Sequence, residues 1–269
     1  MKKNKPFARK RFGQNFLICD YVIDEILHAA HLKPADHIIE IGPGRGALTQ
    51  AILKSDISLT AIEIDRDLTS DLKIRFLGLV HFNLVEGDIL KMDWSEIMEV
   101  HRSYKLIANL PYNISTPLFF KIISSRQQFS SITIMVQKEV AIRLMHNGSG
   151  KNLKNYGILS VIADTLFEIN LICDVPATCF NPAPKVASAV IQLIPKKITI
   201  PEETAFFTLV KKMFNHRRKL LLSSLRKNQP EILKKLSLST MKKLENIRPE
   251  NLSPTDLLEI HLESLNIQS

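Results

Sequence analysis

Four consecutive residues, Asn109 to Tyr112 (NLPY), carry the groups in this sequence best suited to act on an amine. An exocyclic amine such as N6 of adenine is a weak nucleophile, because its lone pair is delocalised into the ring. The side-chain oxygen of Asn109 and the backbone carbonyl of Leu110 can both accept from its N–H groups, which would aim the lone pair at an electrophile. Pro111 has no N–H to compete there and fixes the turn. Tyr112 can stack on a flipped base.

A second candidate site is the glycine-rich stretch 38–46, IIEIGPGRG. An apolar run ends at Glu40 and Ile41, and Gly42, Gly44 and Gly46 then fall at alternate positions. Glycine lets the chain turn sharply and lets its backbone approach a ligand where a Cβ would clash. The spacing is G-x-G-x-G and differs from the G-x-G-x-x-G of dinucleotide sites. Together with the acid that precedes the first glycine, it favours S-adenosylmethionine over NAD.

The elements that must position these groups alternate between strands and helices. One strand leads into the glycine loop, and a helical pattern follows the loop. Further strands are predicted at Ser58–Asp65, Phe82–Leu90, Tyr104–Tyr112, Ser131–Val136, Glu168–Val175 and Ala187–Leu193. Helices are predicted from about Asp20, which is placed as the N-cap, after Asp65, from about Ser115 and from about Tyr156.

This alternation predicts an α/β fold with a mostly parallel sheet and helices on both faces. Ligands of such sheets bind outside the carboxyl ends of the strands. Glu40, Glu63, Asp88 and Asn109 each come at the end of a predicted strand. We therefore expect these four residues to converge on one edge of the sheet, where the cofactor binds.

The composition changes at Pro195, after which the chain has a helical pattern and no strand pattern. Two domains are therefore predicted, residues 1–194, with a basic N-terminal arm over 1–19, and residues 195–269. From Lys196 onward the chain has 14 basic and 8 acidic residues, a net charge of +6 out of +9 for the whole chain. Such an excess favours polyanions. A basic amphipathic helix is predicted at Phe214–Lys227, with Arg217, Arg218, Lys219 and Arg226 as candidate RNA contacts, and the arm adds Lys10 and Arg11.

The cysteines and the hydropathy bound the class of protein. Cys19, Cys173 and Cys179 are odd in number and lack C-x-x-C spacing, which predicts reduced thiols in a cytoplasmic protein and no zinc site. The scattered histidines give no ligand spacing either, so no metal is expected. The basic N-terminus is not followed by an apolar run, so no signal peptide and no membrane span are predicted.

Several motifs together resemble the ribosomal RNA adenine N6-dimethyltransferase family, in particular its bacterial small-subunit (16S) members. They are, in order, KRFGQNFL (10–17), EIGPGRGALT (40–49), AIEID (61–65), EGDIL (86–90), NLPYNISTPL (109–118), FNPAPKVASAV (180–190) and FNHRRKLL (214–221). They cover nearly the whole chain. The resemblance implies a class I, Rossmann-like methyltransferase domain with a small helical domain.

The resemblance also implies roles for single residues. For the cofactor, Asn15 and Leu17 would contact it, Gly42 would lie against its methionine part, Glu63 would accept from both ribose hydroxyls, and Asp88 would accept from its adenine amine; Gly44, Ile64, Ile89 and Asn109 complete that site. For the target base, Asn109 and Tyr112 would hold it together with Leu110 and Pro111, and Phe180 would stack on its other face. Two departures from the family pattern are Asn181, where many relatives carry an aromatic residue, and His216, where the usual residue is Gln.

The activity that the resemblance implies is transfer of two methyl groups to each of two adjacent adenosines near the 3′ end of 16S rRNA, in an immature 30S subunit, by a cytoplasmic and monomeric enzyme. A large-subunit (23S) rRNA adenine methyltransferase shares the cofactor motifs and is the nearest alternative. A DNA adenine methyltransferase is disfavoured, because no target-recognition insertion is evident. An assembly factor whose main role is to bind immature 30S particles is the third alternative.

Overall fold

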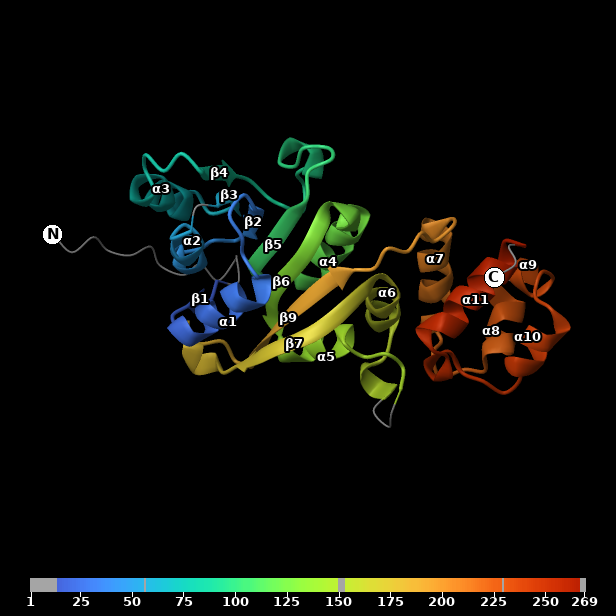
Figure 1. The fold of residues 1–269 in the computed structure, drawn as a ribbon. Coiled ribbons are helices and arrows are strands. Elements are labelled where there is room, and N and C mark those ends of the chain that lie inside the picture. Colours follow the sequence, from blue (N-terminus) through green and yellow to red (C-terminus); the bar gives the residue numbers. More distant parts are fainter. Residues whose placement is uncertain (1–13, 56, 150–152, 229, 267–269) are drawn as a thin grey trace. The chain divides into compact units, whose positions relative to one another are not determined.

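The computed structural model describes residues 14–55, 57–149, 153–228 and 230–266. Its contacts divide the chain into two compact units (Figure 1). The first comprises the described residues up to Ala141 together with Ile169–Pro195, and the second comprises Ile142–Glu168 and the chain from Lys196 onward. The predicted boundary after residue 194 falls at this last junction. Segment 142–168, expected in the first domain, belongs with the helical unit because its helix α6 (Ile158–Leu166) packs against α7 (Glu203–Phe214) and α11 (Pro254–Ser264).

The main sheet has the strand order β4-β3-β2-β5-β6-β9-β7. Its strands are β2 (His37–Ile41), β3 (Ser58–Glu63), β4 (Phe82–Glu86), β5 (Tyr104–Asn109), β6 (Phe129–Gln137), β7 (Phe167–Val175) and β9 (Ser188–Pro195). Strands β4, β3, β2, β5 and β6 pair in parallel, and β9 pairs antiparallel with β6. The predicted strands are thus confirmed; β3, β4 and β5 end earlier than predicted, β6 and β7 are longer, and β9 is shifted toward the C-terminus.

Both faces of this sheet are buried, as the apolar runs require. Ile38 is 1% exposed and belongs to the core cluster that also contains residues of α1 (Asp20–Ala30) and α2 (Ala47–Ile52). Its neighbour Ile39, which points to the opposite face of the pleat, is 0% exposed. The remaining helices of the first unit are α3 (Arg66–Arg75), α4 (Ser115–Ser124) and the start of α5 (Lys138–Leu144).

The helices begin where the sequence predicts them to begin, with one exception at the N-cap of α1. Helix α4 begins at Ser115 as predicted, and the side chain of Asp65 caps α3 by accepting from the Asp67 N–H at 3.2 Å. Asp20, however, is the first helical residue and not the N-cap of α1. Cys19 takes that position with extended backbone and makes no side-chain capping bond. Asp20 still lies in the first turn, where its negative charge interacts favourably with the helix dipole.

A two-stranded antiparallel ladder lies apart from the main sheet. Strand β1 (Phe16–Leu17) pairs with β8 (Phe180–Asn181), with Leu17 opposite Phe180. This pairing sets Cys19 and Cys179 side by side, with Cα atoms 5.0 Å apart, and the two form a disulfide. The prediction of three reduced thiols is therefore wrong, because 160 residues separate the pair in sequence and only the ladder reveals their proximity. Cys173 is a free cysteine.

The second unit is helical throughout its described residues after Pro195, as predicted. Besides α6, α7 and α11 it contains α8 (Leu221–Asn228), α9 (Pro230–Leu233) and α10 (Leu238–Lys243). The single helix predicted over Phe214–Lys227 is wrong, since α7 ends at Phe214 and α8 begins at Leu221. The basic residues Arg217, Arg218 and Lys219 lie in the turn between them. No helix within the described ranges is long and apolar enough to cross a membrane.

Candidate functional site

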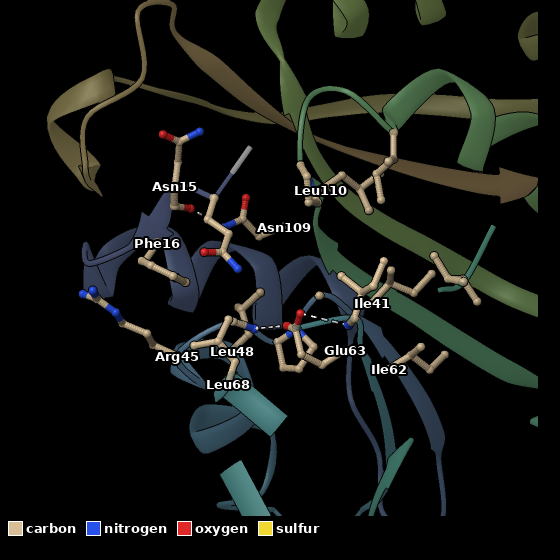
Figure 2. Close-up of a pocket in the computed structure, with 18 of the residues that line it drawn as sticks. Asn15, Phe16, Ile41, Arg45, Leu48, Ile62, Glu63, Leu68, Asn109 and Leu110 are labelled. Carbon is tan, nitrogen blue, oxygen red and sulfur yellow. Dashed lines mark hydrogen bonds between the residues drawn. The ribbon is translucent and has the colours of Figure 1, made fainter. Parts of the chain in front are cut away.

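A cavity of about 340 Å³ opens at the carboxyl edge of the parallel strands (Figure 2). Its walls come from β1, from the glycine loop after β2, from the ends of β3 and β5 with the loops that follow them, and from the loop after β4. The predicted site residues that line it are Asn15, Leu17, Gly42, Gly44, Glu63, Ile64, Asp88, Ile89, Asn109, Leu110, Pro111 and Tyr112. The structure thus brings together twelve residues that lie far apart in the sequence.

The glycine loop forms one wall of this cavity. Gly42, Gly44 and Gly46 have φ angles of +68°, +60° and +74°, in the left-handed region that favours glycine. A Cβ on Gly44 would come within 3.1 Å of the Phe16 ring, and one on Gly46 within 2.9 Å of Leu72. The last two glycines therefore serve close packing around the loop. A Cβ on Gly42 would meet only ordinary van der Waals contacts, so glycine is needed there mainly for its positive φ angle.

Glu63 is held in one orientation by the backbone around it. Its carboxylate accepts from the N–H groups of Gly44 and Ile64 at 3.0 Å and of Asp65 at 2.9 Å. The side chain is only 4% exposed. Burial raises the pKa of Glu63 above its ordinary value, while the three N–H bonds oppose that rise. A carboxylate offers about four lone-pair positions, so capacity remains for a hydroxyl of a ligand in the cavity.

The Asn109 side chain is oriented by the N-terminal segment. Its Nδ2 atom donates to the backbone carbonyl of Asn15 at 3.3 Å, and Figure 2 shows the two residues next to each other. Because the amide nitrogen is engaged by a carbonyl, the amide oxygen is the atom left to accept hydrogen bonds from a substrate amine. Asn15 therefore orients Asn109 in addition to lining the cavity.

The rest of the NLPY segment is tied to neighbouring strands and to α4. The Leu110 N–H donates to the Met135 carbonyl of β6 at 3.1 Å, and the Ser115 hydroxyl donates to the Pro111 carbonyl at 3.3 Å. The Tyr112 hydroxyl hydrogen-bonds to the Ser188 hydroxyl at 2.7 Å. Partial burial raises the pKa of Tyr112, and the bond to Ser188 opposes that rise. The ring is thus neutral and fixed at its far end.

Two predicted residues are placed elsewhere. Glu40 is 1% exposed and lies behind the cavity wall, where its Oε2 atom accepts from the Thr49 hydroxyl at 2.7 Å. It pairs with Ala61 of β3, two residues before Glu63, so it lies below the edge at which the cavity opens. Phe180 is 3% exposed and packs in the core cluster with Leu17, because β8 pairs with β1. No contact in the structure tests the expected stacking of Phe180 on the target base, which stays a prediction.

Three residues that contribute to the site escape the sequence argument. The Arg45 guanidinium lies 4.2 Å from the centroid of the Phe16 ring, so these two side chains close over the glycine loop. Gln14 donates to the Asp65 carboxylate at 2.9 Å and also lines the cavity. Phe16 and Arg45 come from the two strongest motifs. Each stands next to predicted site residues within its motif, and that position was the available signal. Their contact with each other depends on the β1–β8 ladder.

The predicted RNA-contacting residues are not equivalent. Arg217 forms an ion pair with Glu250 at 3.4 Å and donates to the carbonyls of Lys154 and Tyr156 at 3.2 Å. It therefore holds the helical unit together. Arg218, Lys219 and Arg226 are exposed. Lys10 and Arg11 lie outside the described residues.

The cavity fits a nucleoside cofactor that carries an amino acid. Its volume lies within the range of about 300–1,000 Å³ that is usual for small-molecule sites. The loop backbone of Gly42 and Gly44, the Glu63 carboxylate and the Asp88 carboxylate line it together, with the apolar side chains of Ile64 and Ile89. This donor set offers acceptors for hydroxyl and amino groups and apolar surface for a base. It contains no cluster of residues suited to a metal ion within the described part of the chain.

The sheet order, the glycine loop after the first sheet strand and the acid that ends the second define an S-adenosylmethionine-dependent methyltransferase of the class I, Rossmann-like type. The chain belongs to the ribosomal RNA adenine dimethylase family, which matches residues 6–263. The expected family, fold, enzyme class and cofactor are thereby confirmed.

Relatives and solved structures agree with this assignment. The Ribosomal RNA small subunit methyltransferase A of Syntrophotalea carbinolica is 46% identical over 220 residues, covering 81% of each chain. The protein of the same name from Hahella chejuensis is 39% identical over 256 residues, covering 94% of this chain and 91% of the relative. A dimethyladenosine transferase from Plasmodium falciparum superposes with a TM-score of 0.80 at 29% identity, covering 93% and 98%. The 23S rRNA methyltransferase ErmE, with a TM-score of 0.67 at 23% identity over 91% and 99%, shares the fold.

Proposed function

We propose that this protein transfers methyl groups from S-adenosylmethionine to N6 of two adjacent adenosines near the 3′ end of 16S rRNA, and that its substrate is an immature 30S subunit. The observation that carries the proposal is the orientation of Asn109 beside the cofactor cavity, with its amide nitrogen bound by the Asn15 carbonyl. Relatives 46% and 39% identical carry the name of small-subunit rRNA methyltransferases, which supports the choice of 16S rRNA.

The residues of the cavity divide between cofactor and target. Gly42, Gly44, Glu63 and Asp88 hold S-adenosylmethionine, whose sulfonium supplies an activated methyl group. Asn109 and the Leu110 carbonyl accept from the adenine amine and orient its lone pair. Tyr112 stacks on the base, and its raised pKa keeps the hydroxyl neutral. Catalysis by these residues consists of positioning and hydrogen bonding. No general base is required, since the methylated amine loses its proton readily to water.

The exposed cations hold the RNA. Arg218 and Lys219, in the turn between α7 and α8, and Arg226 on α8 contact rRNA phosphates, and the N-terminal arm adds Lys10 and Arg11. The segment 196–269 carries +6 of the net +9, and counterion release from RNA makes such contacts favourable. The enzyme acts as a monomer in the cytoplasm, where ribosomal particles are assembled.

The test is transfer of tritiated methyl groups from S-adenosylmethionine to immature 30S particles, 50S particles and duplex DNA, measured in parallel. Label in 16S rRNA alone is the expected result. Label confined to 23S rRNA would assign the protein to the large subunit, and label in DNA would exclude an RNA enzyme. Tight 30S binding with no transfer to any substrate would leave only a role in assembly.

A further inference from the structure

The Tyr112 ring is anchored at its hydroxyl end by a buried serine from a distant part of the chain. The Tyr112 hydroxyl and the Ser188 hydroxyl are 2.7 Å apart, and Ser188 is 0% exposed. Tyr112 follows β5 in a loop and lines the cavity, whereas Ser188 is the first residue of β9. The bond thus connects a loop residue of the site to the sheet, 76 residues further along the chain.

Ser188 is well fixed by its own surroundings. Strand β9 pairs with β6, where Ser188 lies opposite Gln137, and the Lys138 N–H donates to the carbonyl of Ala187 at 3.0 Å. The end of β9 is therefore held by main-chain bonds on both sides of the serine. The hydroxyl oxygen lies on the long axis of the ring, so a hydrogen bond there fixes the direction of that axis and keeps the ring from swinging about the Cα–Cβ bond.

We propose that Ser188 is a positioning residue for methyl transfer, which fixes the position of the Tyr112 ring against which the target adenine stacks. The inference rests on the proposed function, because it assigns Tyr112 to the target base. A stacking surface held in one place keeps the adenine amine aligned with the Asn109 oxygen at the moment of transfer. A ring that swings from this place would hold the base equally often but align it less often, and misalignment lowers the rate of the chemical step.

The kinetic consequence separates this role from a contribution to binding. Phosphate contacts dominate the affinity for RNA, so the KM for 30S particles should change little when the hydroxyl bond is lost. A hydrogen bond between neutral groups contributes about 0.5–1.5 kcal/mol, so kcat should fall about two- to thirteenfold in Ser188→Ala. The affinity for S-adenosylmethionine should equal that of the wild type, because Ser188 does not line the cavity.

A double-mutant cycle with Tyr112→Phe decides the matter, since this variant keeps the ring and removes the same bond from the other side. We expect each single variant to lose a similar part of kcat, and Ser188→Ala to lower kcat no further in the Tyr112→Phe background. Additive losses would overturn the proposal, because Ser188 would then act on something other than Tyr112. If kcat is unchanged in Tyr112→Phe, the proposal is overturned, even where Ser188→Ala is too unstable to assay.

Ser131 provides the matched control. It is a buried serine of the adjacent strand β6, 6% exposed, and its hydroxyl has no hydrogen-bond partner among the described residues. Ser131→Ala should leave kcat unchanged, and an equal loss there would show that any buried Ser→Ala change disturbs the enzyme and would overturn the assignment to Ser188. If the wild-type protein fails to label 30S particles, the proposed function itself is wrong. That outcome is distinct from a failure of the inference about Ser188.

Discussion

Glu63 is the acid that we propose to bind the ribose of the cofactor. Three backbone N–H groups hold its carboxylate in place before any ligand arrives. Glu63→Ala should weaken S-adenosylmethionine binding at least tenfold, because hydrogen bonds to a charged acceptor contribute about 1.5–3 kcal/mol each. Isothermal calorimetry measures this. Glu86 is its cross-strand neighbour at the end of β4 and does not line the cavity, so Glu86→Ala should bind normally, and equal losses in both variants would contradict the assignment.

Asn109 is the residue that we propose to orient the target amine. Asn109→Ala should reduce single-turnover methyl transfer to 30S particles by about 10²–10³, the usual loss for a preorganised polar group that acts in the transition state. The affinity for S-adenosylmethionine should fall only modestly. Rapid-quench measurement with tritiated cofactor gives the rate. A variant that reacts at the wild-type rate would show that the amine needs no acceptor at this position.

Glu40 makes stability depend on pH. Burial raises its pKa from 4.5 to about 8, although the bond from Thr49 opposes the rise. Between those two pH values the unfolded chain ionises at this position while the folded chain keeps the proton, so the free energy of unfolding should fall as pH rises from about 4.5 to 8. Glu40→Gln cannot ionise and should remove this part of the dependence. Denaturant titrations at several pH values test it, and parallel curves for both proteins would show that Glu40 does not titrate.

Glu40 and Glu63 also show how far single residues can be predicted. Both come at strand ends in the sequence, and both were expected at the cofactor edge. Glu40 lies opposite Ala61, two residues before Glu63, so both acids are on one face of the sheet but only Glu63 reaches the edge and lines the cavity. Which residue reaches the edge depends on the register between the strands, and strand ends cannot be located that accurately from sequence.

At the scale of elements, the strands of the main sheet were predictable because burial on both faces produces apolar runs bounded by turns. The β1–β8 ladder was not predictable from the sequence. Each strand has two residues, and hydrogen bonding across more than 160 positions leaves no local pattern. The disulfide, the contact of Phe16 with Arg45 and the burial of Phe180 all follow from that ladder. These three features therefore share one structural cause.

The turn between α7 and α8 carries the next prediction. The double change Arg218→Ala/Lys219→Ala should weaken 30S binding and flatten its dependence on the logarithm of salt concentration by about 0.7–0.9 per lost phosphate contact. Arg217 is left in place, because its ion pair and two carbonyl contacts are structural.

Filter binding at several salt concentrations measures the slope. The double variant Lys54→Ala/Lys73→Ala, which changes exposed lysines of the first unit, lowers the net charge equally and should keep the wild-type slope. If both double variants flatten the slope equally, the effect is one of net charge and not of this turn.

At the scale of the whole molecule, the chain combines a methyltransferase sheet with a helical unit that carries most of the net positive charge. The motifs predicted the family and the fold, and the match over residues 6–263 confirms the family. The assignment of segment 142–168 to the helical unit could not be predicted, because α6 packs with helices that come much later in the chain. Charge distribution, by contrast, is a property of the sequence alone and was available from the start.

The proposed enzyme dimethylates two adjacent adenosines of 16S rRNA. The most direct measurement is mass spectrometry of nuclease fragments of 16S rRNA, after unmethylated 30S particles have reacted to completion with the protein and S-adenosylmethionine. We predict two added methyl groups on each of two neighbouring adenosines near the 3′ end, and none with Asn109→Ala over the same time. A product that stops at one methyl group, or methylation at any other nucleotide, would contradict the account.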